Sequence, residues 1–220
     1  MEIKKLPLAS VTTVCTEKQY LRFVADNSDK KDLSYIQVVN DLKRGEQCAF
    51  EIKGELPPKS IAVFPTDDVE IGYLLFLLNS YPTQYEMFER KMNVLTHVVL
   101  NKKKLSSLEI PIVAKSEQWY YNIARLLKNK AEEQVKNPNK DYHMAELSYG
   151  LFSNLCDSLA IELYYDDYLN ENGVEIFKCW KQNVDNNLDI NNLKEFFRGL
   201  LDQSSELRNQ LMKLRMLPTE

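Results

Sequence analysis

The stretch from residue 101 to residue 128 constrains the fold most, because its residue pattern changes from extended to helical. After a cluster of three lysines, four apolar residues are spaced as in a short extended segment, at Leu105, Leu108, Ile110 and Ile112. Pro111 lacks a backbone N–H and therefore belongs at a sheet edge or a strand end. Ser116 is a candidate helix N-cap, and Glu117 can interact with the positive end of the helix dipole. Apolar residues then follow at helical spacing, at Trp119, Ile123, Leu126 and Leu127.

The part of the chain before this stretch has the pattern of a mixed sheet with helices. Strand-prone runs are expected at residues 11–15, 34–39, 49–52, 60–64 and 94–100. Between the last two runs, Thr66 is a candidate cap of a buried helix whose first turn would be acidic, with Asp67, Asp68 and Glu70. Strands and helices alternate without a regular repeat, which favours an α+β fold over a doubly wound sheet.

The part after residue 114 is expected to be helical. Leucine-rich spacing predicts a long helix over residues 144–163 and a last helix over residues 193–214. Leu200, Leu207 and Leu214 are seven residues apart, which fits either a coiled-coil seam or packing inside a local bundle. We therefore predict two domains, an α+β domain at residues 1–114 and a helical region at residues 115–220.

The first part of the chain contains three motifs that occur in the same order in a known protein family. They are "Ser34-Tyr35-Ile36-Gln37-Val38…Asp41-Leu42…Gly45", "Ile71-Gly72-Tyr73-Leu74…Leu77-Leu78-Asn79-Ser80" and "Ile110-Pro111-Ile112…Glu117-Gln118". This pattern resembles the target-recognition domain of the DNA-specificity subunits of type I restriction–modification systems. The resemblance covers about the first 130 residues. The segment from Gly45 to Ile61 is much shorter than the family's central insertion, which carries much of the DNA contact.

A second resemblance lies in the helical region. The string from Asp157 to Tyr165, DSLAIELYY, is similar to a helix near the C-terminus of large restriction and phage-defence DNA methyltransferases. The order of a recognition domain, a spacer helix and this helix would correspond to the C-terminal part of such an enzyme without its methyltransferase domain. The alternative interpretation is an amphipathic helix with a tyrosine-rich end.

Charge is distributed unevenly along the chain. Residues 1–140 contain 21 Lys+Arg and 18 Asp+Glu, whereas residues 141–220 contain 7 and 14. Only the first part could offer a basic face to phosphate, and the second part more plausibly binds protein. No acid interrupts the segment from Arg90 to Lys104, and its five cations flank the strand expected at 94–100: Arg90, Lys91, Lys102, Lys103 and Lys104. These are the candidate phosphate-binding residues, or else a solvated lysine loop.

Recognition of a DNA sequence through base contacts would need polar side chains on loops near these cations. The candidates are Gln37, Asn40, Arg44 and Asn101, and Tyr35 could stack or pack. We therefore predict a DNA-binding site of Arg90, Lys91, Lys102, Lys103, Lys104, Arg44 and Gln37.

No catalytic motif is evident, so the chain is not expected to be an enzyme or to hold a cofactor or metal. The one Pro-Pro pair, Pro57-Pro58, lacks the flanking residues of an adenine methyltransferase site, and no phosphate-binding glycine loop is present. The four scattered cysteines and two histidines lack metal-site spacing. A nuclease using Asp67, Asp68 and Glu70 is a weaker alternative, because acids are also favoured at a helix start.

These observations lead to one preferred function and one alternative. The preferred function is a non-catalytic DNA-recognition module that binds double-stranded DNA and docks a methyltransferase or restriction subunit, or another copy of itself, through its C-terminal helices. The alternative is a protein-interaction adaptor that keeps the recognition fold without binding DNA. No apolar run is long enough to cross a membrane and no secretory signal is seen, so we expect a cytoplasmic protein without a membrane partner.

Overall fold

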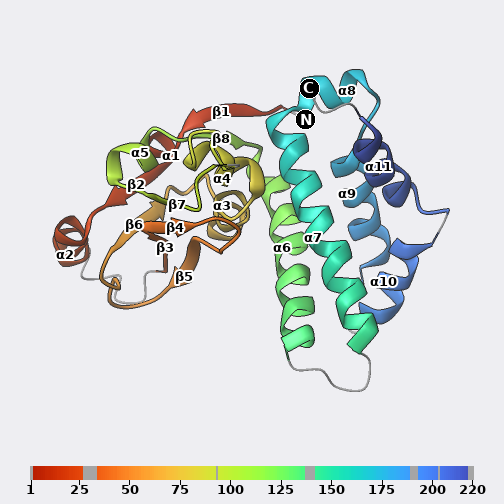
Figure 1. The fold of residues 1–220 in the computed structure, drawn as a ribbon, viewed down its shortest axis with the longest axis horizontal. Helices are drawn as coiled ribbons and strands as arrows, with labels where there is room; N and C mark the ends of the chain where they lie inside the picture. Colours follow the sequence, from red (N-terminus) through yellow and green to blue (C-terminus); the bar gives the residue numbers. More distant parts are fainter. Residues whose placement is uncertain are drawn as a thin grey trace. The chain divides into compact units, whose positions relative to one another are not determined.

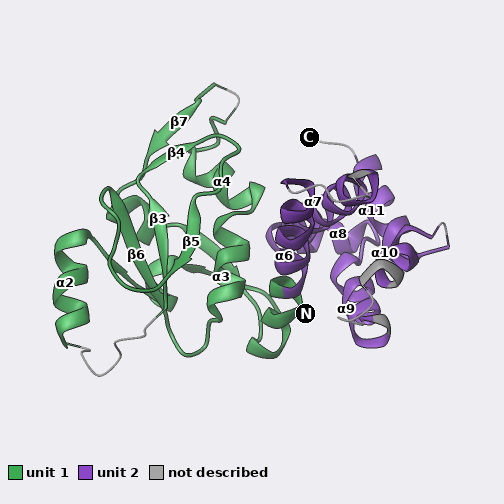
Figure 2. Ribbon diagram, turned by 90° about the horizontal axis from the view of Figure 1, so that it is seen from below, with its two compact units in different colours: residues 1–122 green, residues 123–220 purple. Residues whose placement is uncertain are grey.

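The computed structural model describes residues 2–26, 34–92, 94–136, 142–188, 193–202 and 204–217. The chain forms two compact units, residues 1–122 (unit 1) and 123–220 (unit 2), coloured separately in Figure 2. Unit 1 contains every strand and unit 2 is helical in the described residues, so the fold is α+β followed by a helical region, as predicted. The predicted division after residue 114 coincides with the start of helix α6 (Lys115–Lys136), whose first two turns belong to unit 1.

The centre of unit 1 is a four-stranded antiparallel sheet (Figure 1). Its strands, in spatial order, are β2 (Thr12–Cys15), β6 (Ser60–Pro65), β3 (Tyr35–Val39) and β5 (Ala49–Ile52). The strand-prone runs expected in these four places are confirmed. β6 is almost wholly buried because it is an inner strand and carries the apolar run Ile61–Phe64.

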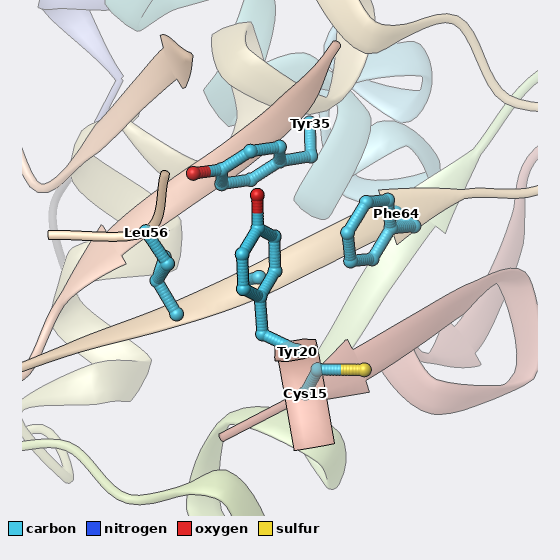
Figure 3. Close-up of a cluster of buried hydrophobic side chains, with 6 residues drawn as sticks. Cys15, Tyr20, Tyr35, Leu56 and Phe64 are labelled. Carbon is cyan, nitrogen blue, oxygen red and sulfur yellow. The ribbon is translucent and has the colours of Figure 1, made fainter. Parts of the chain in front are cut away.

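Helices and an aromatic cluster complete the core of unit 1. α3 (Ile71–Leu78) is buried from Gly72 to Leu78 and packs against β3 and β5. α2 (Glu17–Asp26) packs against β2 and β6 and inserts Tyr20 beside Tyr35 and Phe64, with ring centroids 5.2 Å apart for the tyrosine pair (Figure 3). Both tyrosine hydroxyls donate to the carbonyl of Gly54, so the buried aromatic rings keep their polar ends bonded.

Two smaller sheets and three short helices lie around this centre. β1 pairs with β8, and β4 pairs with β7, both antiparallel. The bounds are β1 (Lys4–Pro7), β4 (Asp41–Lys43), β7 (His97–Val99), β8 (Glu109–Ile112), α1 (Leu8–Val11), α4 (Tyr81–Met87) and α5 (Lys102–Ser106).

Three local predictions for unit 1 were wrong. α3 begins at Ile71, so Asp67 and Asp68 lie in the preceding turn and not in its first helical turn. α6 begins at Lys115, one residue before the predicted cap at Ser116. The extended segment expected from Leu105 is a helix at first, because Asn101 caps α5 by accepting a hydrogen bond from the N–H of Lys104 at 2.9 Å.

In its described residues, unit 2 consists of the rest of α6 and five further helices. They are α7 (Tyr142–Tyr164), α8 (Asp166–Glu171), α9 (Ile176–Asn187), α10 (Leu193–Leu201) and α11 (Glu206–Met216). α7, α9 and α11 pack against one another, and Trp180 of α9 is fully buried. The predicted long helix over 144–163 is confirmed. The predicted single helix over 193–214 is wrong, because α10 ends at Leu201 and α11 begins at Glu206. Leu200 and Leu207 are instead both buried in the bundle, on two different helices.

Candidate nucleic-acid interface

Three of the polar residues considered for base reading have structural roles. Gln37 lies on the inner strand β3 and donates from Nε2 to the Ser60 hydroxyl on β6 at 2.7 Å. Asn101 caps α5. Asn40 directs Oδ1 into the protein, and its backbone binds both Lys59 and Leu100. Gln37, a predicted site residue, is therefore not on a loop, and its amide is bonded across the sheet.

Arg44 occupies a different position, at the tip of the β4–β7 pair. Its N–H donates to the carbonyl of Thr96 at 3.0 Å, and its guanidinium donates from Nη1 to the carbonyl of Met92 at 2.8 Å. The side chain remains exposed. Arg44 is thereby brought close to the segment that carries Arg90 and Lys91, although nearly fifty residues separate them in sequence.

Arg90 and Lys91 lie in a strained turn that follows α4. Glu89 and Arg90 both have left-handed backbone conformations, with φ of 53° and 61°. Such values are uncommon for residues other than glycine and carry a conformational cost. Both of these side chains form ion pairs. Arg90 Nε lies 3.1 Å from Glu86 Oε1, and Glu89 Oε1 lies 2.9 Å from Lys104 Nζ.

The three lysines of α5 point in different directions because successive residues on a helix are about 100° apart. Lys104 reaches Glu89, whereas Lys102 donates from Nζ to Gln19 Oε1 at 2.8 Å. Lys103 is exposed between them. The helix thus joins Lys104 to the Arg90–Lys91 turn and directs Lys102 towards α2.

Glu89 directly precedes the basic segment in sequence and is bonded to Lys104 at the other end of that segment. The bonded Lys104 ammonium, helped by Lys91, holds the pKa of the Glu89 carboxyl below its ordinary value. Within the described residues, Lys91 and Lys103 form no ion pair. Of the six predicted cations, Arg90 and Lys104 are opposed by Glu86 and Glu89, and Lys102 is directed away to Gln19 of α2. The other three, Lys91, Lys103 and Arg44, are exposed.

The β4–β7 ribbon is a candidate element that sequence reasoning missed. Figure 2 shows it apart from the four-stranded sheet at one edge of unit 1. Its register pairs Asp41 with Val99 and Lys43 with His97, and all four side chains are exposed. Leu42, which points to the other side, is fully buried. A strand at 94–100 was expected, but only His97–Val99 is extended, and Val94 is 80% exposed while Leu100 is 1% exposed.

Several residues that carry the family resemblance contact one another or the segments next to the motifs. The Tyr73 hydroxyl donates to the carbonyl of Pro111 at 2.9 Å. The fully buried Gln118 amide accepts from the N–H of Glu70 at 2.7 Å and donates to the carbonyls of Asp68 and Val113. Gly72 lies so close to Asn122 that a Cβ at this position would be 2.3 Å from that side chain. These motif residues thus have an architectural role, joining α3 to β8 and to the start of α6.

The glutamate of the second motif also has an architectural role. Glu162 of α7 is 7% exposed and accepts a hydrogen bond from the N–H of Phe177 at 2.7 Å, at the N-terminal end of α9. Burial raises the pKa of the Glu162 carboxyl to about 7, although the backbone N–H groups of Phe177 and Ile176 oppose the shift. Glu162 of this motif therefore supplies a buried acceptor at the N-terminal end of α9.

Other kinds of site find little support in the described residues. No group of three or more His, Cys, Asp and Glu side chains there could hold a metal ion. All four cysteines are buried and free, and burial raises their thiol pKa values, to about 12 for Cys48. Among the described helices, none is long and apolar enough to span a membrane.

No protein-family model, curated protein or solved structure matches this chain.

The charge balance is different when the chain is divided into its two units and not at residue 140. Unit 1 contains 16 Lys+Arg and 16 Asp+Glu, and unit 2 contains 12 and 16. Unit 1 is therefore neutral, so any attraction of phosphate would have to come from a local group of cations and not from the net charge of the unit.

Proposed function

We propose that unit 1 is a non-catalytic module that binds double-stranded DNA, in a system of the restriction–modification type. The observation that carries the proposal is the juxtaposition of a two-stranded ribbon with a group of cations contributed by three separate segments. Arg44 directly follows β4, Lys91 follows α4, and Lys103 lies on α5. Lys104 and Glu89 tie α5 to the turn that contains Lys91.

Phosphate binding by this group would be modest and strongly dependent on salt. Lysine holds phosphate as a point charge, and each neutralised phosphate releases condensed counterions. With three contacts, from Arg44, Lys91 and Lys103, affinity should fall about 40-fold between about 50 mM and about 200 mM salt. The neutrality of unit 1 gives no long-range attraction beyond that.

The test is a fluorescence-anisotropy titration of a mixed-sequence duplex at two salt concentrations. The double substitution Lys91→Ala/Lys103→Ala should reduce the salt slope by about 2 and weaken binding at low salt. The matched control is Arg22→Ala/Lys53→Ala, which removes the same charge from exposed positions on α2 and after β5. Absence of binding by the unmodified protein at low salt, or equal loss in the control, would overturn the proposal.

A protein-interaction adaptor is the second candidate function, favoured by two observations. Glu86 and Glu89 oppose two of the six predicted cations. Unit 2 is acidic and exposes large aromatic and methionine side chains of a kind enriched at protein interfaces, at the start of α8 and on α11: Tyr165, Tyr168, Met212 and Met216. Size-exclusion chromatography with light scattering tests self-association, and a pull-down with a methyltransferase subunit tests the other partner. A monomer that captures no such subunit would argue against this candidate.

A further inference from the structure

We infer that the outer face of the β4–β7 ribbon reads base edges in the major groove of DNA. The inference rests on the proposed function, because it assigns a reading element to the module that binds the duplex. It concerns the four side chains of the outer face, Asp41, Lys43, His97 and Val99, none of which contributes to the phosphate contacts proposed above.

The ribbon has suitable dimensions for the groove. Beyond its three paired residues per strand, the pairing continues at both ends, from the N–H of Leu100 to the carbonyl of Asn40 and from the N–H of Arg44 to the carbonyl of Thr96. Five residues per strand extend about 17 Å, with the strands about 5 Å apart. The major groove of B-DNA is about 12 Å wide and accepts a two-stranded ribbon.

The chemistry of the outer face suits base edges better than phosphates. Asp41 supplies hydrogen-bond acceptors, and its carboxylate is repelled by phosphate. An acidic side chain is therefore unfavourable on a surface that contacts only the DNA phosphates. Lys43 supplies donors, and His97 supplies either a donor or an acceptor. Val99 is 65% exposed and offers the apolar contact that a thymine methyl group requires. The major groove presents this same combination of donors, acceptors and methyl groups.

The ribbon is held in position from its inner side. Leu42, the middle residue of β4, has a fully buried side chain on the inner face. At the tip, Gln84 of α4 donates from Nε2 to the carbonyl of Glu46 at 3.0 Å, and the guanidinium of Arg44 binds the carbonyl of Met92. A reading element fixed in this way loses little conformational entropy on binding, whereas a free loop would have to be ordered.

The cations beside the ribbon would hold its register on the duplex. Arg44 lies at the tip of the ribbon and bonds to Met92, the residue after Lys91, so both cations are adjacent to the tip. Contacts to phosphate position a protein on DNA, and contacts to base edges determine sequence preference. The two groups of residues should therefore be separable by substitution.

The experiment is an in vitro selection from a randomised duplex pool, carried out with the full chain. The unmodified protein should enrich a preferred sequence. Val99→Ala and His97→Ala should reduce discrimination between the selected and the unselected pool about 5- to 100-fold, while binding to the unselected pool changes little. Thr13→Ala is the matched control, because Thr13 is an exposed strand residue on β2, and it should retain the full enrichment.

Modified bases test the groove directly. Replacing purines of the selected duplex by 7-deazapurines removes the N7 acceptors of the major groove and should weaken binding, whereas inosine in place of guanine alters the minor groove and should not. Binding that is unaffected by the ribbon substitutions and by 7-deazapurines would overturn the inference and leave the proposed function intact. Failure to bind any duplex at low salt would instead overturn the proposed function.

Discussion

Different kinds of interaction stabilise the interior of unit 1 and the interior of unit 2. In unit 1, polar side chains bond to backbone groups of distant segments, as Gln118 does to Asp68 and Glu70 and as Asn79 does to Cys48 and Ala49. In unit 2, the helices pack mainly through apolar faces, and Glu162 is its one buried carboxylate among the described residues. A small antiparallel sheet with irregular connections needs such bonds because those connections leave buried backbone groups to satisfy, whereas helices satisfy most of theirs internally.

The largest effect is expected at Gln118. Gln118→Ala would remove three hydrogen bonds and leave the N–H of Glu70 and two carbonyl groups without their partner, and should lower the free energy of unfolding by about 3–4 kcal/mol. Gln134→Ala is the control on the same helix, since Gln134 is exposed, and should have little effect. Urea unfolding of both variants measures the difference. An equal loss of unfolding free energy in the two variants would show that the hydrogen bonds of Gln118 do not stabilise unit 1 in this way.

The next effect concerns the carboxylate of unit 2. The folded-state pKa of Glu162, about 7, is above its ordinary value, so the unfolded chain releases this proton first as pH rises. Stability from this group is therefore fully present below about pH 4.5 and declines up to about pH 7, by at most about 3 kcal/mol.

Glu162→Gln should abolish this decline, because a glutamine oxygen can still accept from the N–H of Phe177 without titrating. The measurement is the difference in melting temperature between the variant and the unmodified protein from pH 4.5 to pH 8. The exposed Glu171→Gln serves as control. A constant difference across this range would show that Glu162 is charged throughout.

A smaller effect is expected where α3 approaches α6. Gly72→Ala should lower the free energy of unfolding by about 2 kcal/mol, because the new Cβ would overlap the Asn122 side chain. Gly150→Ala, within α7 and with nothing near its Cβ position, should instead raise it by about 0.5–1 kcal/mol. Adding Asn122→Ala should recover part of the loss at Gly72, and a double-mutant cycle measures the coupling. Purely additive losses would contradict a steric cause.

The smallest effect on stability is expected for surface ion pairs of unit 1. Glu86→Gln/Glu89→Gln should leave the melting temperature nearly unchanged, because exposed ion pairs contribute little. The same double variant should bind duplex DNA more tightly and with a salt slope about 2 units steeper, since Arg90 and Lys104 would no longer be opposed. Tighter binding would support the DNA-recognition proposal over the adaptor, whereas unchanged binding would place these two cations outside the interface.

The amino-acid sequence by itself determined the α+β class, the four central strands and the long helix α7, because each depends on apolar periodicity within a short segment. It also located the cations, since charge is a property of single residues. Only the tertiary structure decided what those cations face: Glu86 and Glu89 oppose Arg90 and Lys104, and Gln37 is bonded across the sheet. The β4–β7 ribbon depended equally on the fold, because pairing of Asp41–Lys43 with His97–Val99 joins segments more than fifty residues apart, and no local pattern encodes such a partner.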